Sequence, residues 1–161
     1  MRIIIQKKQF IFHSLMLTLL LSMSSANKVV NEPILFYIEL MTSGEEFSFD
    51  KKFIEAPIGK KIKLKYSNKM DQQGVYHNIA VVKLSKEKEL FKNLKKVNYD
   101  LKKVDRSILL AMTRELKYGE SDTVEFTPDE AGIYVYVCLM PGHGDMMGMR
   151  GELKIINEIK K

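Results

Sequence analysis

The residues best suited to chemistry lie close together between positions 138 and 151, in the stretch CLMPGHGDMMGMRG. This stretch holds Cys138, the only cysteine of the 161 residues, and His143 five positions later. It also holds four of the ten methionines of the chain. Thiolate, imidazole and thioether groups are the side chains that bind soft and borderline metals. The stretch therefore predicts a metal site, although its composition alone does not say which methionine takes part.

One further histidine is available to the same site. The chain has three histidines, and His13 lies in an N-terminal segment of different character, which leaves His77 and His143. Two imidazoles, one thiolate and a weak thioether are the ligand set of a blue-copper electron-transfer site. His77 lies 61 positions before Cys138. The fold must therefore bring two distant segments together.

The N-terminus has the pattern of a secretory signal. Basic residues near the start are followed by an apolar run, FIFHSLMLTLLL, and then by the small residues of SMSSA. We expect residues 1–26 to be a signal peptide cleaved after Ala26, with delivery to the periplasm or secretion. An uncleaved membrane anchor is the alternative. Residues 27–161 are long enough for one domain with one core.

Charge and cysteine content limit the possible functions. The whole chain carries a net charge of +6, and residues 1–26 contribute three basic residues and no acidic one, so residues 27–161 carry +3. This surplus is too small to indicate nucleic-acid binding, and no basic–aromatic motif supports such binding. A single cysteine cannot form a disulfide within the chain. Cys138 is therefore a buried thiol, an intermolecular partner or a ligand.

The pattern between these residues predicts a mostly β fold. In 59–68, Ile62, Leu64 and Tyr66 alternate with lysines, which is typical of a half-buried strand. Strands are predicted on similar grounds at 33–40, 46–57, 59–68, 77–84, 118–128, 131–138 and 151–159. The charged segment 85–107 predicts a helix with Ser85 as its N-cap, followed by a loop. We interpret that segment as a solvent-exposed insertion without a site. The fold class is an all-β Greek-key sandwich with one inserted helical segment.

Several motifs together resemble the cupredoxins, the type 1 blue copper proteins, and are most similar to the azurin and auracyanin group. The motifs are HN at 77–78, GESDTVEF at 119–126, GIYVYVCLMPGH at 132–143 and MRGELKI at 149–155. They cover most of residues 45–157. The resemblance implies a cupredoxin fold that holds one copper ion per chain.

The same resemblance assigns roles to individual residues. It implies that His77, Cys138 and His143 are copper ligands, and that Asn78 ties the first ligand strand to the ligand loop by hydrogen bonds. Azurins have a glycine at the position of Tyr76, and the carbonyl of that glycine is an additional weak contact to copper. The four-ligand site of the auracyanins is therefore the better expectation.

Two methionines compete for the axial position. Counting from His143 favours Met147, whereas counting back from the last strand favours Met149, because Met149 to Leu153 fits the family pattern Met-x-Gly-x-Leu. Strand register determines which side chains face inward, and loops accept insertions at small cost. We therefore predict Met149 as the axial ligand, with Met147 as the alternative.

The resemblance implies an electron carrier rather than an enzyme. The expected partners are redox proteins such as cytochromes or a copper oxidase or reductase, without a small-molecule substrate or nucleic acid, and the chain is expected to be a monomer. An apolar patch of Met140, Pro141 and Met146 around His143 would serve for docking, with core packing as the alternative for at least one of the two methionines. A Cu(I) chaperone or copper-buffering protein that uses the methionine-rich loop is the alternative. An oxidase or nitrite reductase would need histidines for a second copper centre, and residues 27–161 have none to spare.

Overall fold

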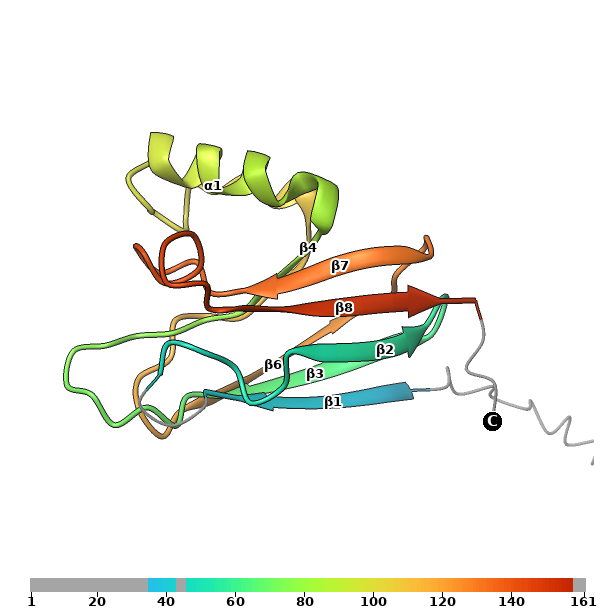
Figure 1. The fold of residues 1–161 in the computed structure, drawn as a ribbon, viewed down its shortest axis with the longest axis horizontal. Coiled ribbons are helices and arrows are strands. Elements are labelled where there is room, and N and C mark those ends of the chain that lie inside the picture. The colour runs from blue at the N-terminus through green and yellow to red at the C-terminus, as the bar shows by residue number, and fades with distance from the viewer. Residues whose placement is uncertain (1–34, 43–45, 158–161) are drawn as a thin grey trace, which may run out of the picture. The chain divides into compact units, whose positions relative to one another are not determined.

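Two β-sheets make up most of the computed structural model, which describes residues 35–42 and 46–157 (Figure 1). The first sheet has the order β1-β3-β6, with β1 at Leu35–Met41, β3 at Lys61–Ser67 and β6 at Ser121–Phe126. The second sheet has the order β2-β8-β7-β4-β5. Its strands are β2 at Phe53–Pro57, β8 at Arg150–Ile156, β7 at Gly132–Val137, β4 at Ala80–Lys83 and β5 at Leu109–Met112.

The alternation in the sequence determines which face of β3 is buried. Ile62, Leu64 and Tyr66 are fully buried, and the lysines between them are partly exposed. β1 runs parallel to β3 on one side, and β6 runs antiparallel on the other. β7 is buried along four consecutive residues, from Tyr134 to Val137, because the other sheet covers one of its faces and a helix covers the other.

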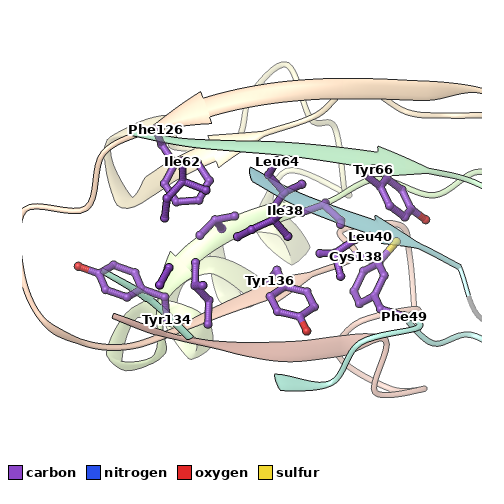
Figure 2. Packing of buried hydrophobic residues seen from close by; sticks show 14 of the residues in the cluster. Ile38, Leu40, Phe49, Ile62, Leu64, Tyr66, Phe126, Tyr134, Tyr136 and Cys138 are labelled. Atoms are coloured by element: carbon purple, nitrogen blue, oxygen red, sulfur yellow. The ribbon is translucent and has the colours of Figure 1, made fainter. Parts of the chain in front are cut away.

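Aromatic side chains fill much of the space between the two sheets (Figure 2). Phe49 lies edge-to-face on Tyr66, with ring centroids 5.7 Å apart, and it also contacts the ring of Tyr136. Cys138 belongs to the same cluster and lies beside these rings in the close view. The thiol is therefore enclosed by the main core.

A second cluster lies on the outer face of the larger sheet, beneath the helix α1 (Glu87–Lys96). The buried side chains of α1 are Leu90, Phe91 and Leu94, at helical spacing. They pack on the side chains of β4 and β7 that point away from the first sheet. Figure 1 shows α1 above β4 and β7, close to the loop that joins β7 to β8.

The observed fold confirms the predicted class, two β-sheets with one inserted helix, but two local predictions were wrong and one strand was missed. Only Phe53–Pro57 of the predicted strand 46–57 is a strand, and it lies at an edge of the second sheet. Ser85 is not the N-cap of α1, because the chain enters the helix through a 3₁₀ turn at Leu84–Lys86 and Lys86 takes the cap position. β5 was not predicted, because its four residues are all partly buried and show no alternation.

The expected signal peptide, residues 1–26, lies outside the described residues. Within the part of the chain that the structure describes, no helix is long and apolar enough to span a membrane.

Candidate metal centre

Three donor atoms from distant parts of the chain meet at one end of the sandwich. The Sγ atom of Cys138 lies 3.8 Å from Nδ1 of His77 and 3.6 Å from Nδ1 of His143. The two Nδ1 atoms are 3.2 Å apart. These residues form the one group of three or more metal-binding side chains found among the described residues. The structure thus brings together the three residues that the sequence predicted as equatorial ligands.

Each donor is held by a different piece of backbone. His77 precedes β4 and forms a two-way bridge with Leu116, with hydrogen bonds of 3.1 Å and 2.8 Å. Cys138 directly follows β7, and its N–H donates to the carbonyl of Met149 at 3.0 Å. The N–H of His143 donates to the carbonyl of Met140 at 3.0 Å, which closes the turn that contains Pro141. Main-chain hydrogen bonds therefore hold the segments that carry the three metal-binding atoms, so that these atoms face one point.

The size of this triangle fits a metal ion. A point equidistant from the three donor atoms lies about 2 Å from each, which compares with metal bonds of about 2.0–2.3 Å to histidine nitrogen and cysteine sulfur. Two imidazoles and one thiolate in a trigonal set are the equatorial ligands of blue-copper sites. The donor set therefore fits copper.

Burial sets the protonation of these groups before a metal binds. Burial, and secondly the nearby His143, lower the pKa of His77 to about 4. Burial also lowers the pKa of His143. Both imidazoles are therefore neutral at pH 7 and can donate a lone pair. Burial raises the pKa of the Cys138 thiol to about 11, against the opposing effect of the N–H groups of Asn78 and Met140. Metal binding must consequently displace a proton from this thiol.

Asn78 connects the two ligand segments. Its Oδ1 atom accepts a hydrogen bond of 2.8 Å from the N–H of Leu139, next to Cys138. Asn78 directly follows His77, so this hydrogen bond connects the segment that carries His77 with the segment that carries Cys138. Outer contacts of this kind orient ligands and adjust the properties of a bound metal.

The methionines of the loop have very different environments. Met149 is fully buried in the main core cluster with Cys138, and its N–H donates to the carbonyl of His143 at 2.8 Å. Met140 is also buried. Met147 and Met146 are 52% and 82% exposed. Burial and main-chain contacts thus place Met149, and not Met147, within the core beside the donor triangle.

Two residues that were not predicted from the sequence also contact the histidines. The ring of Phe47 lies edge-on to the ring of His143, with ring centroids 4.6 Å apart. Its centroid lies 5.7 Å from that of the His77 ring. The thioether sulfur of Met70 lies 3.3 Å from Nε2 of His77. The signal for Phe47 was its alternation with Phe49 in EFSFD. Met70 lies in a stretch without strand or helix periodicity, so no sequence signal marked it.

The inserted segment also contacts the ligand loop, so it is not only the solvent-exposed insertion that the sequence predicted. Asp145 of the loop accepts hydrogen bonds from Nζ of Lys95 and from the hydroxyl of Tyr99, both at 2.9 Å. Arg150 pairs with Glu87 at the other end of α1. The helix therefore braces the loop that carries His143.

Comparisons with known proteins agree with this geometry. A family model described as copper-binding proteins of the plastocyanin/azurin family matches residues 37–156. Auracyanin-B of Chloroflexus aurantiacus is 28% identical over 80% of this chain, and auracyanin-A of the same organism is 30% identical over 68%. The chain spans 56% of the length of auracyanin-B and 69% of that of auracyanin-A.

Solved structures show the same likeness. The dithionite-reduced auracyanin of the photosynthetic bacterium Roseiflexus castenholzii matches with a TM-score of 0.67 at 29% identity, over 74% of this chain and 96% of that one. An azurin from a Methylomonas strain matches with a TM-score of 0.59 at 23% identity, over 75% of this chain and 98% of that one. The second likeness concerns the fold alone.

Proposed function

The chain belongs to the plastocyanin/azurin family of copper-binding proteins, and we propose that it is an electron-transfer protein that cycles Cu(II) and Cu(I) at one type 1 site. The observation that carries this proposal is the triangle of His77, Cys138 and His143, which fits a trigonal copper ion. We assign Met149 as the axial ligand, supported by its complete burial beside Cys138.

The residues around the site suit a metal ion that changes its charge while its ligands keep their positions. Bound copper supplies a group that accepts and releases one electron. The thiolate of Cys138 favours Cu(II), the thioether of Met149 favours Cu(I), and the two imidazoles bind both states. Hydrogen bonds from the main chain and from Asn78 hold the donors in one arrangement, so that little has to reorganise when an electron arrives.

His143 is the donor that faces the surface, and we propose that electrons pass through its edge. It is partly exposed, whereas His77 and Cys138 are buried. Pro141, Met146 and Met147 are exposed on the same loop. Met140 belongs to the core and not to the expected docking patch. A small apolar surface suits a brief complex with a redox protein such as a cytochrome or a copper oxidase or reductase.

Spectroscopy of the copper-loaded protein tests this function. The covalent bond between copper and the Cys138 thiolate should give an intense visible band and a type 1 electron paramagnetic resonance spectrum. The Cys138→Ser variant serves as the control and should lose the band while keeping the fold. A wild-type protein fully loaded with Cu(II) but lacking the band would disprove the proposal.

Two matched substitutions test the axial assignment. Met149→Leu removes the buried thioether with little change in volume, and Met147→Leu does the same at the exposed position. We expect Met149→Leu to shift the reduction potential and change the spectrum, because the site loses one of its ligands, and Met147→Leu to leave both nearly unchanged. The reverse result would assign Met147 instead.

A Cu(I) chaperone or copper buffer is the second candidate, because the thioethers of Met146 and Met147 are exposed beside His143 and soft thioethers select Cu(I). Such a protein should pass Cu(I) readily to an acceptor and bind Cu(II) weakly. Competition titrations with chelators specific for each oxidation state separate the two functions.

The remaining parts of the proposal are a monomeric carrier without enzymatic activity, exported to the periplasm or secreted by a signal peptide at residues 1–26. The pattern of basic, apolar and small residues supports the signal peptide. N-terminal sequencing of the protein from its native host tests it. A mature protein that begins at Asn27 is the expected result, and an intact N-terminus would indicate a membrane anchor.

A further inference from the structure

The buried imidazole of His77 has two nitrogens in different surroundings. Nδ1 faces the donor triangle, 3.2 Å from Nδ1 of His143 and 3.8 Å from the sulfur of Cys138. Nε2 faces the sulfur of Met70 at 3.3 Å. A neutral imidazole carries one proton, and a metal bound at Nδ1 leaves that proton on Nε2. The N–H group of the ring therefore points at a thioether.

This partner is unusual for a ligand histidine. Metal-binding histidines almost always donate their other N–H to a carboxylate, a carbonyl or water. A thioether sulfur is only a weak acceptor. His77 is fully buried and Met70 is 2% exposed. The thioether thus occupies the place that a strong acceptor normally takes.

The position of Met70 is built into the fold. The N–H of Met70 donates to Oδ1 of the buried Asn68 at 3.0 Å, and Nδ2 of Asn68 donates to the carbonyl of Leu116 at 3.0 Å. The same carbonyl accepts the N–H of His77 at 3.1 Å. Met70 and His77 are therefore anchored to one shared residue, Leu116, and their contact follows from the backbone arrangement.

We propose that Met70 is a positioning residue that accepts the Nε2–H of His77 and, as a weak acceptor, raises the reduction potential of the copper site. A strong acceptor would pull on the proton and make the imidazole more basic. A more basic imidazole stabilises Cu(II) over Cu(I). The thioether keeps the imidazole less basic and so favours Cu(I). This proposal rests on the proposed function. It adds a determinant of the reduction potential on the side of His77 that does not face the donor triangle.

Two substitutions at position 70 separate the acceptor from its bulk. Met70→Gln has a similar length and offers a strong carbonyl acceptor, whereas Met70→Leu keeps the volume without any acceptor. Met112→Gln is the control, because it makes the same chemical change at a partly buried methionine of β5, outside the site. The potential of each protein is measured by redox titration of the visible band.

We expect Met70→Gln to lower the potential, so that the ratio of Cu(I) to Cu(II) at a fixed ambient potential falls roughly tenfold, a size taken from the lower end of the effects of such outer partners on metal affinity. Met70→Leu should not lower the ratio, and Met112→Gln should leave it unchanged. Equal potentials in wild type and Met70→Gln, or an equal fall in Met70→Gln and Met70→Leu, would overturn the proposal.

Nuclear magnetic resonance of the diamagnetic Cu(I) protein reads the contact directly, even if Met70→Gln does not fold. The Nε2–H proton of His77 should exchange slowly with water and shift upfield in Met70→Leu. Absence of that proton in the wild type, or an unchanged shift in Met70→Leu, would disprove the hydrogen bond. The proposed function fails separately, through the missing visible band of the Cu(II) protein, since a Cu(I) chaperone would still show the ring proton.

Discussion

The Nδ1 atoms of two neutral imidazoles face each other at 3.2 Å, next to a protonated thiol. This arrangement favours a metal ion held by all three donors over a single added proton, because burial disfavours a charged imidazole. The fold stabilises it by burying His77 completely and surrounding it with Met70, Phe47 and the main chain of Leu116. Low pH should therefore act against the metal-free fold at this point.

The metal-free protein should lose stability as the pH falls from about 6.5 to about 4. The pKa of His77 is about 4 in the folded protein and about 6.5 in the unfolded chain. Between these values the unfolded chain binds more protons, so the free energy of unfolding falls with pH, by up to about 3 kcal/mol. The lowered pKa of His143 acts in the same direction.

Chemical denaturation of the metal-free protein at pH 7, 5.5 and 4 measures this loss. His77→Gln is the matched control, because it removes the titrating group and should flatten much of the dependence. A wild-type profile as flat as that of His77→Gln would contradict the expectation.

At the scale of elements, the loop between β7 and β8 lies between the sandwich and α1. Gly144 is the residue at the contact. An added Cβ atom there would clash with Phe91 of α1, with Val137 and with the carbonyl of Cys138. The loop can pass beneath the helix only because this position lacks a side chain.

Gly144→Ala should therefore destabilise the protein by about 1–3 kcal/mol, the usual cost of overpacking, and should alter the copper spectrum by displacing Cys138. Gly59→Ala is the matched control. Gly59 has a φ of +69° and open space around it, so it should cost about 1 kcal/mol of backbone strain and leave the spectrum unchanged. Thermal unfolding and electron paramagnetic resonance measure the two effects. An unchanged spectrum in Gly144→Ala would show that the helix does not constrain the loop.

The elements also show how far the sequence can predict the site. Local alternation predicted β3 and β7, and the motif after β7 predicted the cysteine and the second histidine. The contact of Met70 with His77 and the contacts of the α1 segment with the ligand loop could not be predicted in this way. They depend on Asn68, Leu116 and Asp145, which act through hydrogen bonds between segments distant in the sequence. A charged segment gives no local sign of which residues its apolar face will cover.

At the scale of the molecule, positive charge is concentrated beside the ligand loop. Residues 83–106 hold nine basic and four acidic residues, so the rest of 27–161 carries a net charge of −2. Lys88, Lys92 and Lys95 of α1 line a shallow hollow together with Met146 and Arg150 of the loop region. The partly exposed edge of His143 therefore lies in the same loop region as a basic surface.

Electron transfer with small charged reagents should reveal this surface. The reduced protein should react faster with anionic ferricyanide than its potential alone would give, and this advantage should shrink as salt screens the charges. Lys88→Glu combined with Lys92→Glu should slow ferricyanide severalfold and speed a cationic cobalt(III) complex. Lys60 and Lys63 lie toward the end of β3 farther from the ligand loop. Replacing both by Glu should change the rates with ferricyanide and with the cobalt complex much less. Stopped-flow kinetics at several ionic strengths measure these rates, and equal effects of the two double variants would contradict the local role of α1.

The hydrogen bonds that shape the ligand loop come from the protein itself, and this has a consequence for metal choice. The carbonyl of His143 accepts the N–H of Met149, and the carbonyl of Met149 accepts the N–H of Cys138, so the main chain sets the spacing of the donors and does not itself select one metal. Zinc accepts the same thiolate and imidazole donors. A chain that folds where zinc is abundant and copper is scarce should therefore become filled with zinc and remain colourless. Correct loading then depends on which ion the newly folded chain meets first.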